Sequence, residues 1–193
     1  EVLDRELQTV ECLHRDRGLS EPTSIVTPRH QSPSYEVLRD HGIETIRRPP
    51  EEYSPPKWKD AGGPVGTLIW LLIRHHPKTV LTSSEGLVET QCTPYPSLTS
   101  PLFPTGQLLV HPVIRLIPQL IRQRIHANYL RRAVDQAAAT NGHIHLWTHT
   151  YNLVHPDQRY GIRRGLQHLA KRRDEGEIVV KRMCDLPQVL TDG

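Results

Sequence analysis

Hydrophobic residues recur at helical spacing in the first stretch of the chain, where Leu3, Leu7, Val10 and Leu13 fall on one side of residues 2–16. This spacing predicts an amphipathic helix. Similar patterns predict long helices over residues 112–140 and 156–175. A proline at the first turn indicates another helix over 64–76, Gly42 indicates the end of a short helix over 35–41, and a short helical turn is expected over 186–190. Pro118 lies inside the pattern over residues 112–140, and because proline removes a backbone donor we expect the helix to restart or kink there.

Short apolar runs between these helices predict strands at residues 24–27, 43–46, 86–91 and 178–180. Up to residue 46 the order is helix, strand, helix, strand. This alternation is typical of a parallel sheet with helices packed outside it. We therefore expect an α/β fold made mainly of parallel strands.

Residues 143–149 lie between an Asn-Gly breaker and Pro156, and they alternate as a strand does. One face of the predicted strand is polar or aromatic, with His143, His145, Trp147 and His149. The opposite face carries Ile144 and Leu146, which we expect to be buried in a core. Imidazole is an unusual core lining and acts as acid, base or ligand near neutral pH. We therefore expect the histidine face to look into a polar cavity.

Composition places limits on the function. The chain has 193 residues, of which 36% are hydrophobic and 23% charged, so one domain with a substantial core is expected over residues 1–193. The formal net charge of +3 is too small to indicate a nucleic-acid partner by itself. No apolar run reaches the length of a membrane span.

The three cysteines, Cys12, Cys92 and Cys184, are odd in number and widely spaced, which argues against a disulfide framework. Their usage fits a reducing compartment, and a cytoplasmic location is expected. The chain begins at Glu1, inside a predicted helix and without an initiator methionine. We therefore expect it to be a piece of a longer protein.

Two polar clusters follow predicted strands: Arg29-His30-Gln31 after the first strand, and residues 149–152 after the histidine-rich one. Active sites of α/β folds gather where strands reach their C-terminal ends. We therefore expect Arg29 and His149 to approach one cavity, although 120 positions separate them along the chain.

At these clusters the chain resembles the polysaccharide deacetylases, the NodB-homology carbohydrate esterases. Residues 24–31 read Ser-Ile-Val-Thr-Pro-Arg-His-Gln, similar to an apolar strand followed by Pro-Arg-Asn-Gln in one branch of that family. Residues 145–153 read His-Leu-Trp-Thr-His-Thr-Tyr-Asn-Leu, similar to its His-Leu-Trp-x-His-Pro-x-Asn-Leu. The resemblance implies a partial, distorted (β/α) barrel, with residues 1–193 as the C-terminal part of one deacetylase domain.

The resemblance also implies roles for individual residues. Family members hydrolyse acetyl groups from N-acetylated sugars with the help of a divalent metal such as zinc. His149 would protonate the departing amine, and Arg29 would hold the catalytic carboxylate. A carbohydrate substrate would be contacted by Trp147, His145, His30 and Asn152. Asn152 is also a candidate for holding its loop through side-chain hydrogen bonds to the backbone.

The chain departs from the family pattern in several places. His30 stands where asparagine is usual, and Thr150 where proline is usual. The Thr-Phe-Asp-Asp-like and His-x-x-x-His motifs, which supply the family's metal ligands and catalytic aspartate, do not occur. We therefore expect no metal ligand in this chain, and no deacetylation by these 193 residues alone.

Three alternatives stay open. The chain is a non-catalytic carbohydrate-binding or interaction module, or it holds a separate metal site built from His145 and His149 with His143. In the third alternative, basic residues between 163 and 173 form a nucleic-acid face. Acidic residues at 174, 175 and 177 interrupt that run, so a solvated helix face is favoured and no nucleic-acid partner is expected.

Overall fold

The computed structural model describes residues 2–27, 33–48, 62–73, 79–91, 98–105 and 109–191. The chain forms two compact units. The first comprises Glu1–Pro49, Val80–Gln91 and Val180–Gly193, and the second Pro50–Thr79 and Cys92–Val179. The expectation that residues 1–193 belong to one domain stays a prediction.

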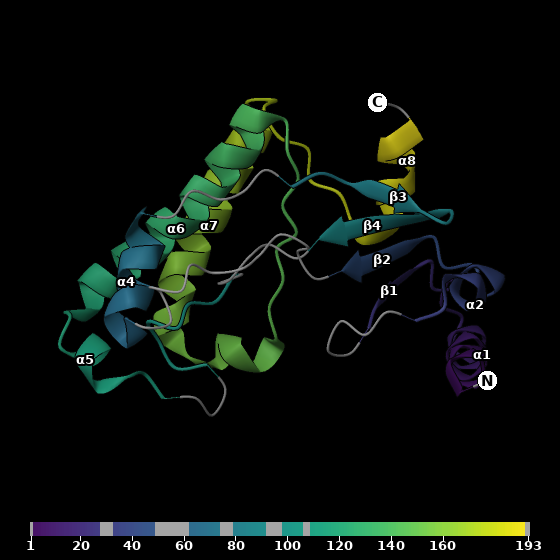
Figure 1. Ribbon diagram of the computed structural model, residues 1–193, viewed down its shortest axis with the longest axis horizontal. Helices are drawn as coiled ribbons and strands as arrows, with labels where there is room; N and C mark the ends of the chain where they lie inside the picture. Colours follow the sequence, from purple (N-terminus) through teal and green to yellow (C-terminus); the bar gives the residue numbers. More distant parts are fainter. Residues whose placement is uncertain are drawn as a thin grey trace. The chain divides into compact units, whose positions relative to one another are not determined.

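The first unit is built on a four-stranded sheet in the order β1 (Ser24–Val26), β2 (Thr45–Arg48), β4 (Leu87–Gln91), β3 (Thr82–Ser84) (Figure 1). β1, β2 and β4 run parallel, and β3 pairs antiparallel with β4. The predicted mixed α/β fold with mainly parallel strands is therefore confirmed. The sheet formed by the described strands is open and does not close into a barrel.

Helices α1 (Val2–Asp16) and α2 (Tyr35–Asp40) supply the apolar core of the first unit. Leu7 of α1 and Leu38 of α2 pack in one cluster with Ile46 of β2 and Leu87 of β4. The first helix was predicted from its apolar spacing, and the second from the glycine at position 42 that ends it. After α2 the imidazole of His41 contacts two carboxylates of α1, which reinforces the apolar packing between the two helices.

The second unit contains the helices α4 (Gly63–Ile73), α5 (Pro112–Arg115), α6 (Gln119–Thr140) and α7 (Pro156–Asp174), with a 3-10 turn η2 (Thr150–Val154). The helix break predicted at Pro118 is confirmed, since Pro118 caps the start of α6. The apolar core of this unit contains Leu71 of α4, Ile114 of α5, and Tyr129 and Leu130 of α6.

Two of the predicted strands need correction. Residues 178–180 are irregular and not a strand, and Val179 is 74% exposed. Three β-prone residues do not make a strand unless a neighbour pairs with them, and no described strand does. The second strand begins at Thr45 and not at Ile43. After residue 180 the chain forms a 3-10 turn η3 (Met183–Asp185) and the predicted short helix, α8 (Leu186–Thr191).

Strand β3 was not predicted because Thr-Ser-Ser has no apolar alternation. It pairs with β4 through a tight turn at Glu85 and Gly86, whose φ angles are 48° and 81°. Two consecutive positive φ angles are the requirement of the two-residue hairpin turn that matches strand twist. β3 therefore forms because the tight turn brings it alongside β4, and not because of its own side-chain pattern.

Candidate functional site

The histidine-rich segment connects two helices that run in the same direction. A Cβ at Gly161 of α7 would meet His126 of α6, and one at Gly165 would meet Leu130. Further along, His168 of α7 bonds Asp135 of α6. Position numbers rise together in these pairs, so α6 and α7 are parallel neighbours, as Figure 1 shows.

Parallel helices require the chain to return between them. Position 156 lies level with about position 121, so the return spans about 19 helical residues, or about 28 Å. Only residues 141–155 are available, and five of them form η2. Residues 143–149 must therefore run extended, and Figure 1 shows them as a single thread from the end of α6 to η2.

The extended segment is not the predicted strand. Within it only His143 forms a β-bridge, with Thr79. Further along, the carbonyl of Trp147 accepts a hydrogen bond from the amide of Leu98 at 3.2 Å. A strand is defined by a ladder to a neighbour, and no described strand lies along this segment. The alternating side chains correctly predicted an extended backbone, but they could not show whether another strand pairs with it.

The burial predicted for Ile144 and Leu146 is also wrong. Both side chains are half-buried, and so is His145 on the opposite face. Because the segment is not sandwiched inside a sheet, neither face is sealed from solvent. The predicted contrast between a core face and a cavity face is therefore absent.

Three aromatic rings form a row along the end of this segment. The ring of Trp147 meets His149 edge-on, with centroids 5.4 Å apart and an interplanar angle of 86°. His149 in turn stacks on Tyr151 at 4.9 Å and 10°. His149 and Tyr151 are exposed, and Trp147 is half-buried. We call Trp147, His149 and Tyr151 the aromatic row.

The imidazole of His149 is held by ring contacts. The backbone carbonyl of His149 accepts a hydrogen bond from the backbone amide of Asn152 at 3.0 Å, and this bond closes the turn into η2. No described residue forms a hydrogen bond with either ring nitrogen of His149. The row thus fixes the ring plane and leaves its nitrogens available to another molecule.

Tyr151 was missed by the sequence reasoning, although a signal was present. The alternation that placed Trp147 and His149 on one face continues to position 151. The polar and aromatic face was predicted only as far as His149. Tyr151 lies in the turn η2, so its stacking on His149 also depends on that turn.

Asn152 holds its turn through the backbone and not through its side-chain oxygen. Its side chain is buried, with the residue 7% exposed, and its Oδ1 accepts no hydrogen bond within the described part of the chain. A buried acceptor without a donor costs about 1–3 kcal/mol. The predicted loop-holding role of that oxygen is therefore not supported by any described contact.

His143 lies at the start of the extended segment, where hydrogen bonds to Thr79 hold the backbone in place. Its amide donates to Thr79 O at 2.7 Å, and Thr79 Oγ1 donates to its carbonyl. Burial lowers the pKa of the His143 imidazole below its usual range. These contacts agree with a structural role for His143.

Arg29 and His30 lie outside the described residues. The predicted approach of Arg29 to His149, and the predicted substrate contact of His30, therefore stay predictions. So do the substrate contacts of His145 and Asn152.

The described residues do not fit a bound metal ion. Among them, no group of three or more His, Cys, Asp or Glu side chains is arranged to hold one. The aromatic row surrounds His149 with carbon-rich rings and places no carboxylate beside it. The alternative metal site on His145 and His149 with His143 therefore has no complete ligand set here.

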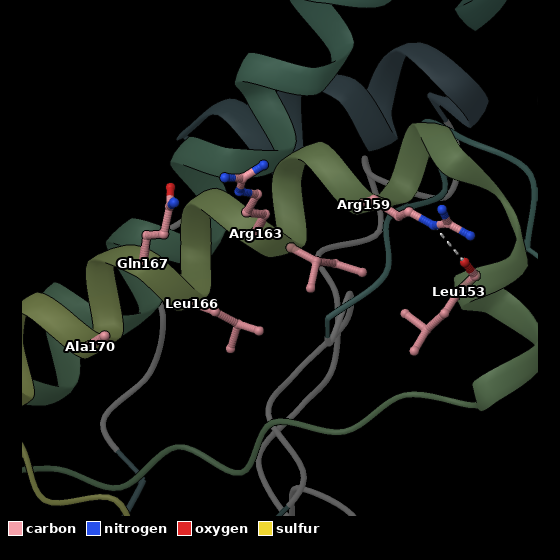
Figure 2. A pocket seen from close by; sticks show the side chains of 7 residues that line it. Leu153, Arg159, Arg163, Leu166, Gln167 and Ala170 are labelled. Atoms are coloured by element: carbon pink, nitrogen blue, oxygen red, sulfur yellow. Dashed lines mark hydrogen bonds between the residues drawn. The ribbon is translucent and has the colours of Figure 1, made fainter.

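An apolar hollow of about 550 Å³ lies beside α7, directly after the turn that carries Asn152. Figure 2 shows Leu153 of η2 and Leu166 of α7 projecting into the same space. Arg159 also lines the hollow, and its Nε donates to Leu153 O at 3.3 Å. The hollow thus continues the η2 turn along one face of α7.

No protein-family model, no curated protein and no solved structure matches the chain. The family resemblance therefore rests on the residues quoted above. Within the described ranges, no helix combines the length and apolar character needed to cross a membrane.

Proposed function

We propose that this chain is the C-terminal part of a (β/α)-barrel-like domain that hydrolyses acetyl groups from an N-acetylated sugar. A divalent metal would be held by residues other than those described here. The observation that carries the proposal is the aromatic row of Trp147, His149 and Tyr151, on an extended segment between two parallel helices.

The arrangement of α6, the extended segment and α7 supports the barrel part of the proposal. Parallel α/β barrels repeat a helix, a returning strand and a helix parallel to the first. The segment has that course and lacks only a paired neighbour within the described chain. The three parallel strands β1, β2 and β4 are consistent with the same fold.

The chemistry of the aromatic row supports the catalytic part. An amide nitrogen leaves poorly as an anion, so a positioned acid must protonate it. His149 is exposed, its ring plane is fixed on two sides, and no described residue bonds its nitrogens. In the proposal a ring nitrogen of His149 delivers that proton to the departing amine.

The same row provides a binding face for a sugar. The apolar C–H face of a pyranose ring packs on flat aromatic side chains, while its hydroxyls stay in water. Tyr151 is 55% exposed and stacks nearly parallel on His149, so the face of its ring that points away from His149 is the flat surface proposed for the sugar. Trp147 meets His149 edge-on and supports the stacked pair.

Binding by the 193-residue chain tests the proposal without requiring turnover. N-acetylated chitotetraose is titrated while tryptophan fluorescence is followed, with the de-N-acetylated tetramer as the matched sugar. Tyr151→Ala should weaken binding of the acetylated tetramer about three- to tenfold, since an aromatic contact contributes about 0.5–1.5 kcal/mol. The same titration of Val154→Ala, an exposed apolar residue of the same turn, should give the wild-type affinity.

Equal losses in Tyr151→Ala and Val154→Ala would remove the row from sugar binding. Undetectable binding of both tetramers to the wild-type chain would contradict the proposal itself. A non-catalytic carbohydrate-binding module is the second candidate, because the aromatic row would serve it equally well. Acetate release by the full-length product of the gene distinguishes the two, since only the deacetylase requires His149 as an acid.

A further inference from the structure

A second hollow, of about 440 Å³, lies between α6 and α7 and shares no residue with the aromatic row. Four cationic side chains contribute to its lining, together with a histidine and polar groups. The lining residues that the argument uses are Arg124, Asn128, Arg131, Arg164, Gln167 and Lys171. We call this hollow the cationic groove.

Positive charge is concentrated on these two helices. Together α6 and α7 carry ten Lys and Arg side chains and three Asp, a net +7, whereas the whole chain carries +3. The remainder of the chain is therefore at net −4. The small net charge of the whole chain therefore results from a strongly basic helix pair that is offset by an acidic remainder.

The cations of the groove are largely without partners in the described part of the chain. No carboxylate lies within ion-pair distance of Arg124, Arg131 or Arg164 there, and Lys171 reaches Glu175 only at 3.6 Å. The one acidic side chain on α6, Asp135, is already bonded by His168 at 2.6 Å and by Arg172 at 2.8 Å. The groove thus combines like charges that repel one another until an anion enters.

The cations form two rows. Arg124 and Arg131 are seven residues apart on α6, and Arg164 and Lys171 are seven residues apart on α7. Seven residues are two helical turns, about 10.5 Å. Because the helices are parallel neighbours, the two rows face one another across the groove and favour an elongated anion.

We propose that the cationic groove binds an acidic polysaccharide, through carboxylate or sulfate groups held by Arg124, Arg131, Arg164 and Lys171. Guanidinium groups hold such oxyanions by paired hydrogen bonds. The amides of Asn128 and Gln167 are exposed between the two rows and suit sugar hydroxyls. The volume of the groove lies in the range of sites for small ligands, so it holds one or two sugar units of a longer chain.

Other polyanions fit the lining less well. Single-stranded nucleic acid requires exposed aromatic rings for base stacking. Of the two rings that line the groove, Tyr160 lies under the guanidinium of Arg164 at 5.6 Å, and His168 is bonded to Asp135 at 2.6 Å. A membrane surface requires apolar side chains that insert, and the only apolar side chain of the lining is Ala127.

The test uses the 193-residue chain and four fluorescent probes: an oligogalacturonate octamer, a sulfated octasaccharide, a neutral maltooctaose and a 20-base-pair DNA duplex. Arg131→Gln and Arg164→Gln are compared with Arg163→Gln, which removes the same charge from the adjacent position on another face of α7. Circular dichroism verifies that each variant keeps the wild-type helix content.

We expect at least one acidic octasaccharide to bind at 0.1 M salt while the neutral one does not. Arg131→Gln and Arg164→Gln should each weaken binding about five- to tenfold and reduce the slope of log K against log salt by about 1. Arg163→Gln should change affinity less than about twofold, since its charge lies outside the groove.

Three results would overturn the proposal. One is failure of both acidic octasaccharides to bind the wild-type chain. Another is equal weakening by Arg163→Gln, which would show a diffuse charge effect. The third is tighter binding of the duplex than of either octasaccharide, weakened by Arg131→Gln and Arg164→Gln, which would assign the groove to nucleic-acid phosphates. The carboxylate and sulfate probes distinguish the two acidic chemistries.

Discussion

Substituting Gly161 by alanine tests how closely α6 and α7 pack. A Cβ at this position would lie 2.5 Å from Cγ of His126, whose side chain is fully buried. Ordinary contacts need about 3.5 Å, so the ring or the helix must move by about 1 Å. His126 has little freedom to move, because its Nε2 is tied to Leu98 O at 3.0 Å.

The expected cost has two opposing parts. Overpacking costs about 1–3 kcal/mol, while replacing glycine inside a helix gains about 1 kcal/mol. Gly161→Ala should therefore lower the free energy of unfolding by up to about 2 kcal/mol, measured by urea denaturation followed at 222 nm. In a His126→Ala background the ring is gone, and the same change should stabilise by about 1 kcal/mol.

Gly165→Ala is the matched control, because its Cβ would meet Leu130 and not His126. His126→Ala should therefore leave the cost of Gly165→Ala nearly unchanged. If Gly161→Ala costs the same with and without the His126 ring, or if it stabilises the wild-type chain, the packing described for these helices is wrong.

Three further predictions concern buried polar groups. Hydrogen bonds to two carboxylates of α1, Asp4 most strongly and then Glu11, raise the pKa of His41. The contribution of His41 to stability is therefore full below its unfolded pKa of about 6.5 and is lost as pH rises through the raised folded value. The difference in unfolding free energy between wild type and His41→Gln should shrink over that range of rising pH. Burial lowers the pKa of His126 to about 4, so its contribution is full above about 6.5 and falls by about 3 kcal/mol as pH drops through 4, a loss that His126→Gln should abolish in urea titrations. Tyr35→Phe removes the hydroxyl that donates to Glu89 at 2.5 Å, and should cost about 1–3 kcal/mol by thermal and urea unfolding because that carboxylate is buried.

The elements that could be predicted from sequence are those whose own side chains specify them. Apolar spacing defined α1, α6 and α7 to within two residues of their observed ends, apart from the break at Pro118 that was also predicted. The alternation of helix and strand gave the parallel pairing of β1 with β2. In each case the signal lies within the element, or in its immediate neighbours along the chain.

The elements that could not be predicted depend on a partner elsewhere in the chain. Residues 143–149 and 178–180 have strand-like side chains, but pairing decides whether an extended segment becomes a strand. β3 is the converse, since its side chains carry no apolar signal and a tight turn pairs it with β4.

The candidate site shows the same division. The face shared by Trp147 and His149 followed from a period of two, and the ring contacts between them agree with it. The stacking of Tyr151 on His149 depends on the turn into η2, which the alternation does not describe. The roles of Arg29 and His149 stay predictions, because no described contact tests them.

Acetate release is the measurement that tests the central claim most directly. The full-length product of the gene is assayed on N-acetylated chito-oligosaccharides as wild type, His149→Ala and Tyr151→Leu. The proposed acid role predicts that His149→Ala lowers kcat about 10²- to 10⁴-fold, while Tyr151→Leu mainly raises KM. Acetate release by His149→Ala within twofold of wild type, or no release by the wild-type protein with added zinc, would contradict the account.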